Sequence, residues 1–358
     1  MRRVALDHLP GVTHAPGVGR YARELARALC ARDDAPELVL SEVGPGARSQ
    51  EHRLVGLEPA TRVRRVVRER WLQLQRDLLR RGAERYLPPV DLFHCTRPLL
   101  PALGRVPRVV PVADLPRVGS PAERALAGAA RGAAAVVVFA DCLRAPVAER
   151  LDVPLGRVHW TPVGSEHFER ERTSTDASPT GGPRILVLGA VREARRPEVV
   201  LAAFEQVLCA EPEARLLLLG RAGDRGDALT RALASSPARS AVEWHSGDVE
   251  DELPEALAQA DVLLHLAESE SSPVTPLEAL AAGAAVVAEP LPAFVEALGP
   301  HGRWVTPAAD DVAGGVLDAL RDSRDEQVRS KRRAHAATFT WDRCAAATLE
   351  VWRGILPT

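Results

Sequence analysis

Short apolar runs alternate with longer stretches of helical periodicity along the whole chain. This alternation is typical of α/β folds whose strands form parallel sheets. The run Leu216–Leu219 is entirely apolar, which predicts a strand buried on both faces of its sheet. In the first half of the chain we predict strands over residues 3–7, 38–43, 92–94, 108–112, 135–139 and 158–161. We predict helices there over residues 19–31, 62–85, 121–131 and 142–151.

The polar segment 169–183 interrupts this alternation. It is rich in Ser, Thr, Gly and Pro, which predicts a linker. Behind it we predict a helix over residues 197–211 and strands over 184–189, 215–219, 242–245, 262–266, 284–288 and 302–305. The sequence therefore predicts two doubly wound Rossmann-like domains, 1–168 and 184–340, and a final helix in 341–358 that crosses back to the first domain. Ligands of such sheets bind at the carboxyl ends of the strands, and we expect these ends to face each other across a cleft.

Composition narrows the class of protein. Of the 358 residues 46% are hydrophobic, so two domains can each bury a core. Charged residues make up 26% and the net charge is −2, which argues against a nucleic-acid binder. No apolar run is long enough to span a membrane, and Asp7 ends the first one too early for a signal peptide. Five scattered cysteines without a C-x-x-C pair predict reduced thiols in a cytoplasmic protein.

Two glutamates flank a loop that leads from a predicted strand into a predicted helix. Glu270 follows the strand 262–266, and Glu278 lies in the helix that Pro276 opens. Backbone N–H groups at such a helix N-terminus form a seat for phosphate. Carboxylates would repel a phosphate unless they bind sugar hydroxyls, so the pair suits a sugar nucleotide, with one carboxylate for the ribose and one for the transferred sugar. The alternative is a surface glutamate and a second one favoured by the helix dipole.

The spacing Glu270-x7-Glu278, followed by Ala-Leu-Ala-Ala-Gly, resembles the E-x7-E signature of family 4 retaining glycosyltransferases, also called group 1, which have the GT-B fold. Further segments resemble this family in the same order along the chain. They are Gly17-Val18-Gly19-Arg20-Tyr21, Asp91–His94, 133–163, 184–189 and Phe339-Thr340-Trp341. The resemblance thus covers nearly the whole chain, and it implies a nucleotide-sugar co-substrate and no cofactor.

The resemblance also implies roles for individual residues. Glu270 would hold the hydroxyls of the transferred sugar and Arg195 the diphosphate, which makes them the expected catalytic residues. The other donor-binding residues that it implies are Glu278 (for the ribose), Gly17, Gly19, Arg192, Arg196, Asp248, Val249, Ser272, Val274 and Thr275. On the acceptor side it implies Arg20, Tyr21 and Asp114.

Several of these motifs also have a structural interpretation. A Gly-x-Gly sequence occurs in many turns that bind no ligand. Glycine also lets a backbone approach a phosphate closely. Arg195 takes the position of the family's lysine, with Arg196 as the alternate, and guanidinium groups grip phosphate well. However, only Lys331 among the 46 basic residues is lysine, so an arginine-rich loop is also what a solvated surface of this chain would carry. The turn 246–249 would read the base through backbone groups, which leaves the base open.

Three departures from the family pattern affect the expected activity. Pro273 stands in the loop between the two glutamates and removes one backbone N–H from the phosphate seat. Ala113 replaces the histidine of the family's H-D-L motif, and Val163 replaces the asparagine of its P-N-G turn. These changes predict an altered donor or acceptor preference, or weakened catalysis.

The predicted helix 62–85 has apolar residues at three- and four-residue spacing and many arginines. Such a basic amphipathic helix can rest on an anionic membrane, here at its inner face. A packed helix with a solvated cationic face is the interpretation that we favour. The histidines stand apart from paired carboxylates, so we also predict that the protein works without a metal ion.

The sequence thus predicts a cytoplasmic, metal-independent, retaining glycosyltransferase that moves a hexosyl or related group from a nucleotide sugar to a hydroxyl acceptor. A secondary metabolite, a polysaccharide or a glycolipid would serve as acceptor. The arginine-, alanine- and proline-rich composition indicates a GC-rich bacterial genome. The alternative is a catalytically weakened GT-B-like protein that binds a partner or a sugar nucleotide. The sugar, the base, the acceptor and the oligomeric state stay open.

Overall fold

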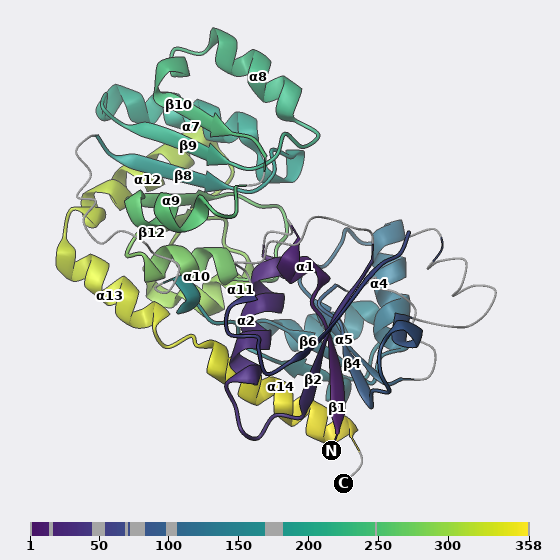
Figure 1. Cartoon of the computed structure of the whole chain (residues 1–358). Coiled ribbons are helices and arrows are strands. Elements are labelled where there is room, and N and C mark those ends of the chain that lie inside the picture. The colour runs from purple at the N-terminus through teal and green to yellow at the C-terminus, as the bar shows by residue number, and fades with distance from the viewer. Residues whose placement is uncertain are drawn as a thin grey trace. The chain divides into compact units, whose positions relative to one another are not determined.

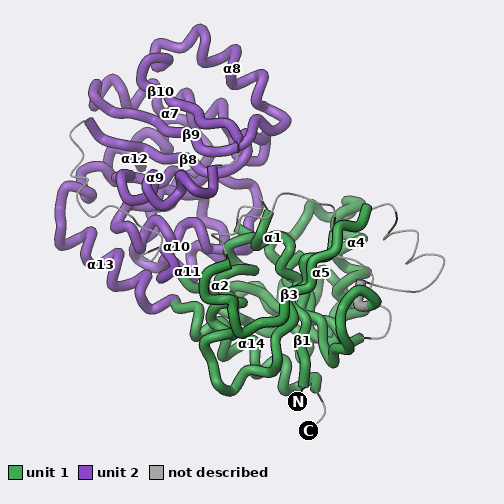
Figure 2. Tube along the Cα trace, in the orientation of Figure 1, with its two compact units in different colours: residues 1–164, 340–358 green, residues 165–339 purple. Residues whose placement is uncertain are grey.

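A computed structural model of the chain describes residues 2–13, 17–44, 54–68, 71, 83–97, 106–168, 182–247 and 249–356. The chain folds into two compact units (Figures 1 and 2). Unit 1 comprises Met1–Gly164 and Thr340–Thr358, and unit 2 comprises Ser165–Phe339. The unit changes after Gly164 rather than after residue 168. Ser165 belongs to unit 2 because its amide donates to Phe339 O (2.9 Å) and its hydroxyl to Ala336 O (2.9 Å).

Unit 1 is built on a seven-stranded parallel sheet of order β3-β2-β1-β4-β5-β6-β7. The strands are β1 (Arg3–Asp7), β2 (Glu37–Gly44), β3 (Thr61–Val66), β4 (Leu92–His94), β5 (Arg108–Val112), β6 (Ala135–Val138) and β7 (Val158–Trp160). The α-helices are α1 (Leu9–Val12), α2 (Val18–Cys30), α4 (Pro121–Arg131), α5 (Arg144–Leu151) and α14 (Trp341–Ile355). Strands β4 and β6 are buried along their whole length, as expected for apolar runs inside a parallel sheet.

Helix α14 brings the end of the chain into unit 1, where it packs on α2. The buried indole of Trp352 donates to His94 Nδ1 (3.1 Å), and the hydroxyl of Tyr21 lies 2.9 Å from His94 Nε2. An indole N–H can only donate, so the neutral imidazole carries its proton on Nε2 and donates to Tyr21. Burial lowers the pKa of His94 to about 3, which keeps the ring neutral. His94 therefore joins the sheet, α2 and α14 inside unit 1.

The helix that we expected over residues 62–85 is wrong for its first part. Residues Thr61–Val66 form β3, which pairs with β2 at the edge of the sheet. The β-branched residues of this segment favour an extended chain, and this preference outweighs the helical spacing. Its arginines are mostly exposed, and charges on an edge strand hinder pairing with other chains. Residues 69–70 and 72–82 of the expected helix lie outside the described residues.

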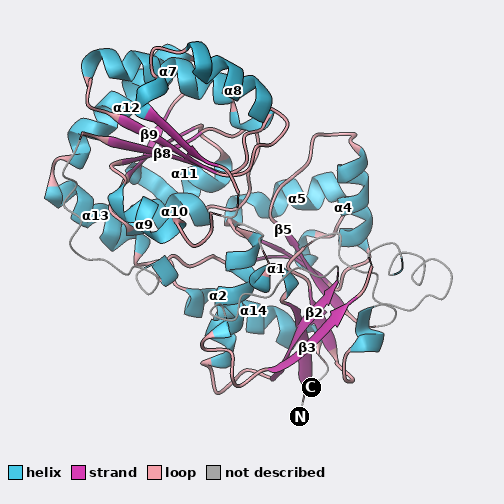
Figure 3. Ribbon diagram, turned by 45° about the horizontal axis from the view of Figure 1, so that its top comes forward, coloured by secondary structure: helices cyan, strands magenta, loops and turns pink. Residues whose placement is uncertain are grey.

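Unit 2 holds a six-stranded parallel sheet of order β10-β9-β8-β11-β12-β13, covered by helices on both faces (Figure 3). The strands are β8 (Arg184–Leu188), β9 (Arg215–Leu219), β10 (Val242–His245), β11 (Val262–His265), β12 (Ala285–Ala288) and β13 (Gly302–Trp304). The α-helices are α7 (Pro197–Ala210), α8 (Gly226–Ser235), α9 (Leu253–Gln259), α10 (Val274–Ala281), α11 (Pro292–Leu298), α12 (Ala309–Ser323) and α13 (Glu326–Ala336).

The strand order determines where each unit can bind a ligand. Counted from its first strand, each sheet contains the order 3-2-1-4-5-6 of the doubly wound fold. In that fold, ligands bind outside the carboxyl ends of the strands, at the switch point between the first and the fourth strand. The switch point lies between β1 and β4 in unit 1 and between β8 and β11 in unit 2.

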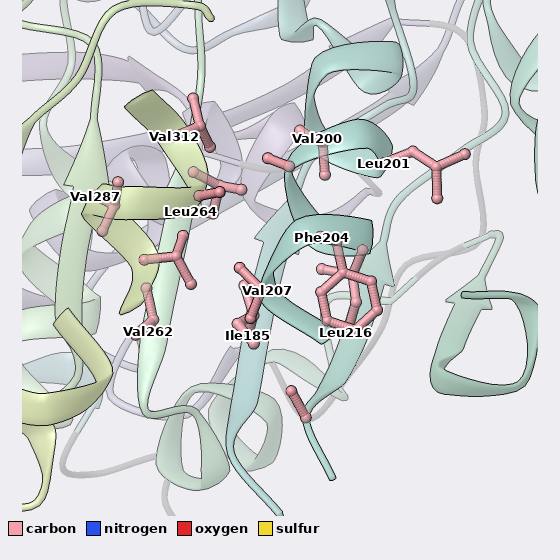
Figure 4. Close-up of a cluster of buried hydrophobic side chains, with 14 of the residues drawn as sticks. Ile185, Val200, Leu201, Phe204, Val207, Leu216, Val262, Leu264, Val287 and Val312 are labelled. Carbon is pink, nitrogen blue, oxygen red and sulfur yellow. The ribbon is translucent and has the colours of Figure 1, made fainter. Parts of the chain in front are cut away.

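The core of unit 2 packs β8, β9 and β11 against α7 (Figure 4). Ile185, Leu216 and Val262 of the strands meet Val200 and Phe204 of the helix, and all five side chains are buried. Burial of one such side chain contributes about 1.5–3 kcal/mol relative to leaving it in water. This packing holds β8 and β11 in place, so the residues at the ends of these strands have a rigid support. None of the helices in the described ranges is long and apolar enough to cross a bilayer.

Candidate functional site

Three polar side chains meet at the switch point of unit 2. Arg195 ends a short 3-10 turn after β8, His265 is the last residue of β11, and Glu270 lies in the loop that follows. Arg195 Nη2 lies 2.8 Å from Glu270 Oε2, and Arg195 Nη1 lies 2.6 Å from His265 Nε2. His265 Nε2 lies 2.9 Å from Glu270 Oε2. Arg195, His265 and Glu270 are called the switch-point cluster below.

The cluster holds one cation and one anion that both reach solvent. Burial opposes ionisation of Glu270, but His265 and Arg195 outweigh it and lower the pKa of this carboxyl to about 2. Burial also lowers the pKa of His265, so that the ring is neutral at neutral pH. The side chains of Arg195 and Glu270 are 28% and 18% exposed, whereas that of His265 is 1% exposed. A ligand can thus contact the guanidinium and the carboxylate, with the imidazole behind them.

Arg196 binds a different carboxylate from its neighbour. Its Nε and Nη2 donate to Glu289 Oε2 (2.8 Å) and Oε1 (3.0 Å), and Glu289 Oε2 also accepts from Ala267 N (3.0 Å). Arg196 adopts the left-handed conformation (φ 53°), which costs a residue with a side chain about 1 kcal/mol or more. The two arginines therefore have separate roles in the structure: Arg195 belongs to the cluster, and Arg196 fastens the loop to the end of β12.

Glu278 lies inside α10 and is buried. Its Oε1 is 2.7 Å from Nε2 of His167, which is buried as well. His167 belongs to the segment through which the chain enters unit 2. The residue expected to bind the ribose is thus hydrogen-bonded to a histidine that lies 111 positions earlier in the chain.

Pro273 lies at the end of the loop before α10, where the sequence predicts the loss of one backbone N–H. This proline is the N-cap residue of α10, with no side-chain cap, and the helix proper begins at Val274. Val274 is buried, while Ser272 and Thr275 are half-buried. The phosphate seat that we expect here would therefore use backbone groups of this first turn and of the loop, without an N–H from Pro273.

The remaining donor-side candidates are more scattered. Arg192 is exposed at the start of the 3-10 turn that ends in Arg195. Val249 is half-buried after β10, and Asp248 lies outside the described residues. In unit 1, Gly17 precedes α2 with φ 73°, and a Cβ at Gly19 would lie 2.6 Å from Pro10 O, so that only glycine fits there. The Gly-x-Gly motif thus has a structural reason that does not depend on a ligand.

The three acceptor-side candidates separate into two environments. Arg20 and Tyr21 are buried, and the Tyr21 ring packs edge-on against Phe139 at 4.8 Å. Asp114 is exposed in the loop that follows β5. Tyr21 is therefore a core residue of unit 1, and of the three only Asp114 presents its side chain to solvent.

Sequence reasoning missed several polar residues that the fold brings together. At the switch point of unit 1, Arg97 Nε and Nη2 donate to Asp7 Oδ2 and Oδ1 (both 3.1 Å), and the Thr96 hydroxyl donates to Asp7 Oδ2 (2.7 Å). The sequence did contain a signal for this group of residues. Asp7 ends one predicted strand, and Thr96 and Arg97 follow the end of another. His265 was missed because it continues an apolar strand. Within the described part of the chain, no group of three or more His, Cys, Asp or Glu residues could hold a metal ion.

Two units with doubly wound parallel sheets, and polar residues gathered at the switch point of each, define a two-domain Rossmann-like protein of the GT-B type. Residues 169–336 match the family described as "Glycosyl transferases group 1".

Individual relatives fit this assignment. The chain is 26% identical to the D-inositol 3-phosphate glycosyltransferase of Xylanimonas cellulosilytica in an alignment of 408 positions. This match covers 96% of this chain and 93% of the relative. Over 117 residues it is 36% identical to the MMP α-(1→4)-mannosyltransferase of Mycolicibacterium hassiacum, but that match spans only 31% of this chain and 28% of the relative. The fold is shared with Anabaena HepE, solved in complex with UDP and glucose, at a TM-score of 0.71 and 16% identity over 99% of both chains.

Proposed function

We propose that the protein transfers a sugar from a nucleotide-sugar donor to a hydroxyl group of an acceptor, with retention of the anomeric configuration and without a metal ion. The observation that carries the proposal is the switch-point cluster, in which an arginine and an ionised glutamate lie side by side at the ligand-binding edge of unit 2. The UDP and glucose bound to HepE, and the transferase names of the relatives, support the donor class.

Each residue of the cluster suits a part of such a donor. Arg195 would hold the diphosphate and stabilise the negative charge that builds up on it as the sugar leaves. Glu270 is ionised and would accept hydrogen bonds from sugar hydroxyls. Glu278 would accept from the ribose hydroxyls. In the front-face displacement that the family resemblance implies, the leaving phosphate takes the proton of the acceptor hydroxyl, and the protein mainly orients the reactants.

A donor panel tests this proposal. The purified chain is incubated with UDP-, GDP- and dTDP-sugars, and release of the nucleoside diphosphate is measured with and without EDTA. We expect release from at least one donor at a rate that EDTA leaves unchanged. Once an acceptor is found, NMR of the product shows whether the anomeric configuration is retained. If no donor of a panel that includes the common hexoses is either bound or hydrolysed, the proposal is contradicted.

A second candidate function is that of a weakened transferase that binds a sugar nucleotide or a partner protein without transfer. Pro273 favours it, because this residue stands at the N-cap of α10 without an N–H to offer. Calorimetry separates the two candidates. Donor binding with turnover supports the enzyme, while donor binding without turnover supports the weakened form. Restoring the N–H in Pro273→Gly should then raise turnover in the weakened form.

A further inference from the structure

A histidine at position 265 lowers the stability of the fold, which indicates that the residue has a function. It ends a strand whose other residues, Val262, Leu263 and Leu264, are all apolar and buried. His265 Nδ1 is buried and has no hydrogen-bond partner among the residues that the structure describes. A buried polar group without a partner costs about 1–3 kcal/mol, and an apolar side chain at this place would avoid that cost.

The other ring nitrogen faces two groups that make opposite demands. A guanidinium can only donate, so at 2.6 Å from Arg195 Nη1 the Nε2 atom must accept. The carboxylate of Glu270 can only accept, so at 2.9 Å it is satisfied only by an Nε2 that carries the proton. A neutral imidazole cannot do both. As long as Arg195 stays in place, Nε2 accepts from its guanidinium and the hydrogen bond to Glu270 comes from Arg195.

Recognition of a donor would resolve this conflict. This step rests on the proposed function, in which Arg195 turns toward a diphosphate. Once Nη1 leaves His265, the tautomer with its proton on Nε2 becomes the favoured one, because it can donate to Glu270. The ring takes up a proton at Nε2, on the side of the partly exposed Arg195 and Glu270, and releases the one on Nδ1, so that it carries a single proton before and after the change.

We propose that His265 is a positioning residue, which holds Glu270 in place for the transferred sugar when Arg195 is engaged by the diphosphate. His265 does not contact the reacting atoms. It acts through Glu270 and couples recognition of the diphosphate to recognition of the sugar. Its ring also packs edge-on against Phe294 (5.3 Å between centroids), which keeps Nε2 directed at the other two members of the cluster.

Two variants of the full-length chain separate positioning from packing. His265→Leu fills the space without a polar atom, whereas His265→Gln places an amide near Nε2 that can donate to Glu270 and accept from Arg195. We expect the turnover number of His265→Leu to fall about ten-fold or more, with a smaller change in the donor KM, because Glu270 is no longer aligned. We expect His265→Gln to stay within about three-fold of the wild-type protein. His335→Leu is the matched control, since it removes a histidine bonded to a backbone carbonyl elsewhere in unit 2.

The outcomes decide the matter in either direction. A slow His265→Leu variant and a near-normal His265→Gln variant, with unfolding midpoints similar to that of the control, support the positioning role. A His265→Leu variant with wild-type turnover overturns it. Equal losses in both variants, accompanied by lower unfolding midpoints, also overturn it, because they indicate packing alone.

A measurement on the free protein keeps this inference separate from the proposed function. Imidazole ¹⁵N shifts, assigned to His265 by comparison with His265→Gln, report which nitrogen carries the proton. We expect an unprotonated Nε2 in the wild-type protein and a protonated Nε2 in Arg195→Ala. The same tautomer in both would overturn the inference. If no donor is turned over, the proposed function fails, and the nitrogen shifts still decide whether Arg195 controls the proton of His265.

Discussion

His167 Nε2 lies 2.7 Å from Glu278 Oε1, and both side chains are almost fully buried. The contact joins the segment through which the chain enters unit 2 to α10, the helix that follows the cluster loop. The carboxyl Oε1 accepts, so the imidazole N–H donates to it. The second glutamate of the E-x7-E pair therefore has a structural partner in addition to the ligand that we propose for it.

Glu278→Gln tests the ligand role while preserving the contact. The amide oxygen can still accept from His167, so we expect the unfolding midpoint to change little. A hydrogen bond from a ribose hydroxyl to a charged group is worth about 1.5–3 kcal/mol, so the affinity for the matching nucleoside diphosphate should fall about ten-fold or more. Calorimetry with UDP and GDP measures this change. An unchanged dissociation constant would contradict the ribose role, and His167→Gln then shows whether the pair serves folding only.

Arg195 and Arg196 are adjacent in sequence, but their loss should have different effects. Arg195→Ala removes a cation that stabilises charge on the leaving diphosphate, so we expect turnover to fall by about 10²-fold, and stability to fall as well because Glu270 loses its ion pair. Arg196→Ala leaves the buried Glu289 without its bidentate partner and should reduce the free energy of unfolding by about 1–3 kcal/mol.

Turnover with a competent donor and chemical denaturation of both variants measure this difference. The same pattern of loss in the two variants would show that the loop acts as one unit. If Arg196→Ala loses turnover and Arg195→Ala does not, the diphosphate is held by Arg196.

The fold could be predicted from the sequence because most of its strands are short apolar runs. Their length and their alternation with segments of helical periodicity identify them. The alternation placed β8, β9 and β11 within a residue of their observed bounds, and it failed at β3, where arginines and β-branched residues share an exposed edge strand. The cluster was only half predicted. Arg195 and Glu270 stand in motifs with known spacing, but His265 continues an apolar strand and Glu289 follows another. Only the pairing of β11 with β8 and β12 shows that the ends of these strands meet.

His245 lies between two carboxylates directly before the turn expected to read the base. Its Nε2 is 2.7 Å from Glu243 Oε1 and its Nδ1 is 2.5 Å from Glu252 Oε2, and these hydrogen bonds raise the pKa of His245. A raised pKa in the folded state means that the stabilisation is complete below the ordinary value of about 6.5 and is lost as the pH rises through the folded value. His245→Gln should therefore lower stability near pH 5.5 and have almost no effect near pH 9.

The size of this effect is limited because the His245 side chain is 38% exposed, so the loss should stay below about 1 kcal/mol. His301 provides a control of opposite sign. Burial and the nearby His335, Arg332 and Lys331 lower the pKa of His301. His301→Gln should accordingly gain stability relative to the wild-type protein as the pH falls below about 6.5. Urea denaturation at both pH values measures both variants. A His245→Gln loss that does not depend on pH would contradict the ion-pair explanation.

Glu270 connects the activity of the protein with its stability. Its lowered folded pKa of about 2 implies a stabilisation that is complete above the ordinary glutamate value of about 4.3 and is lost as the pH falls toward 2. Glu270→Gln should therefore be less stable than the wild-type protein by about 2–3 kcal/mol at pH 6, and this difference should shrink by pH 3.

The same variant should lose transfer while its affinity for the bare nucleoside diphosphate stays within about three-fold, because that ligand lacks the sugar whose hydroxyls Glu270 would accept from. Denaturation at the two pH values, calorimetry with the diphosphate and a turnover assay test these three expectations on one preparation. Wild-type turnover in Glu270→Gln would remove Glu270 from sugar recognition, whereas equal losses of affinity for the sugar nucleotide and for the bare diphosphate would mean that Glu270 acts by holding Arg195 in place.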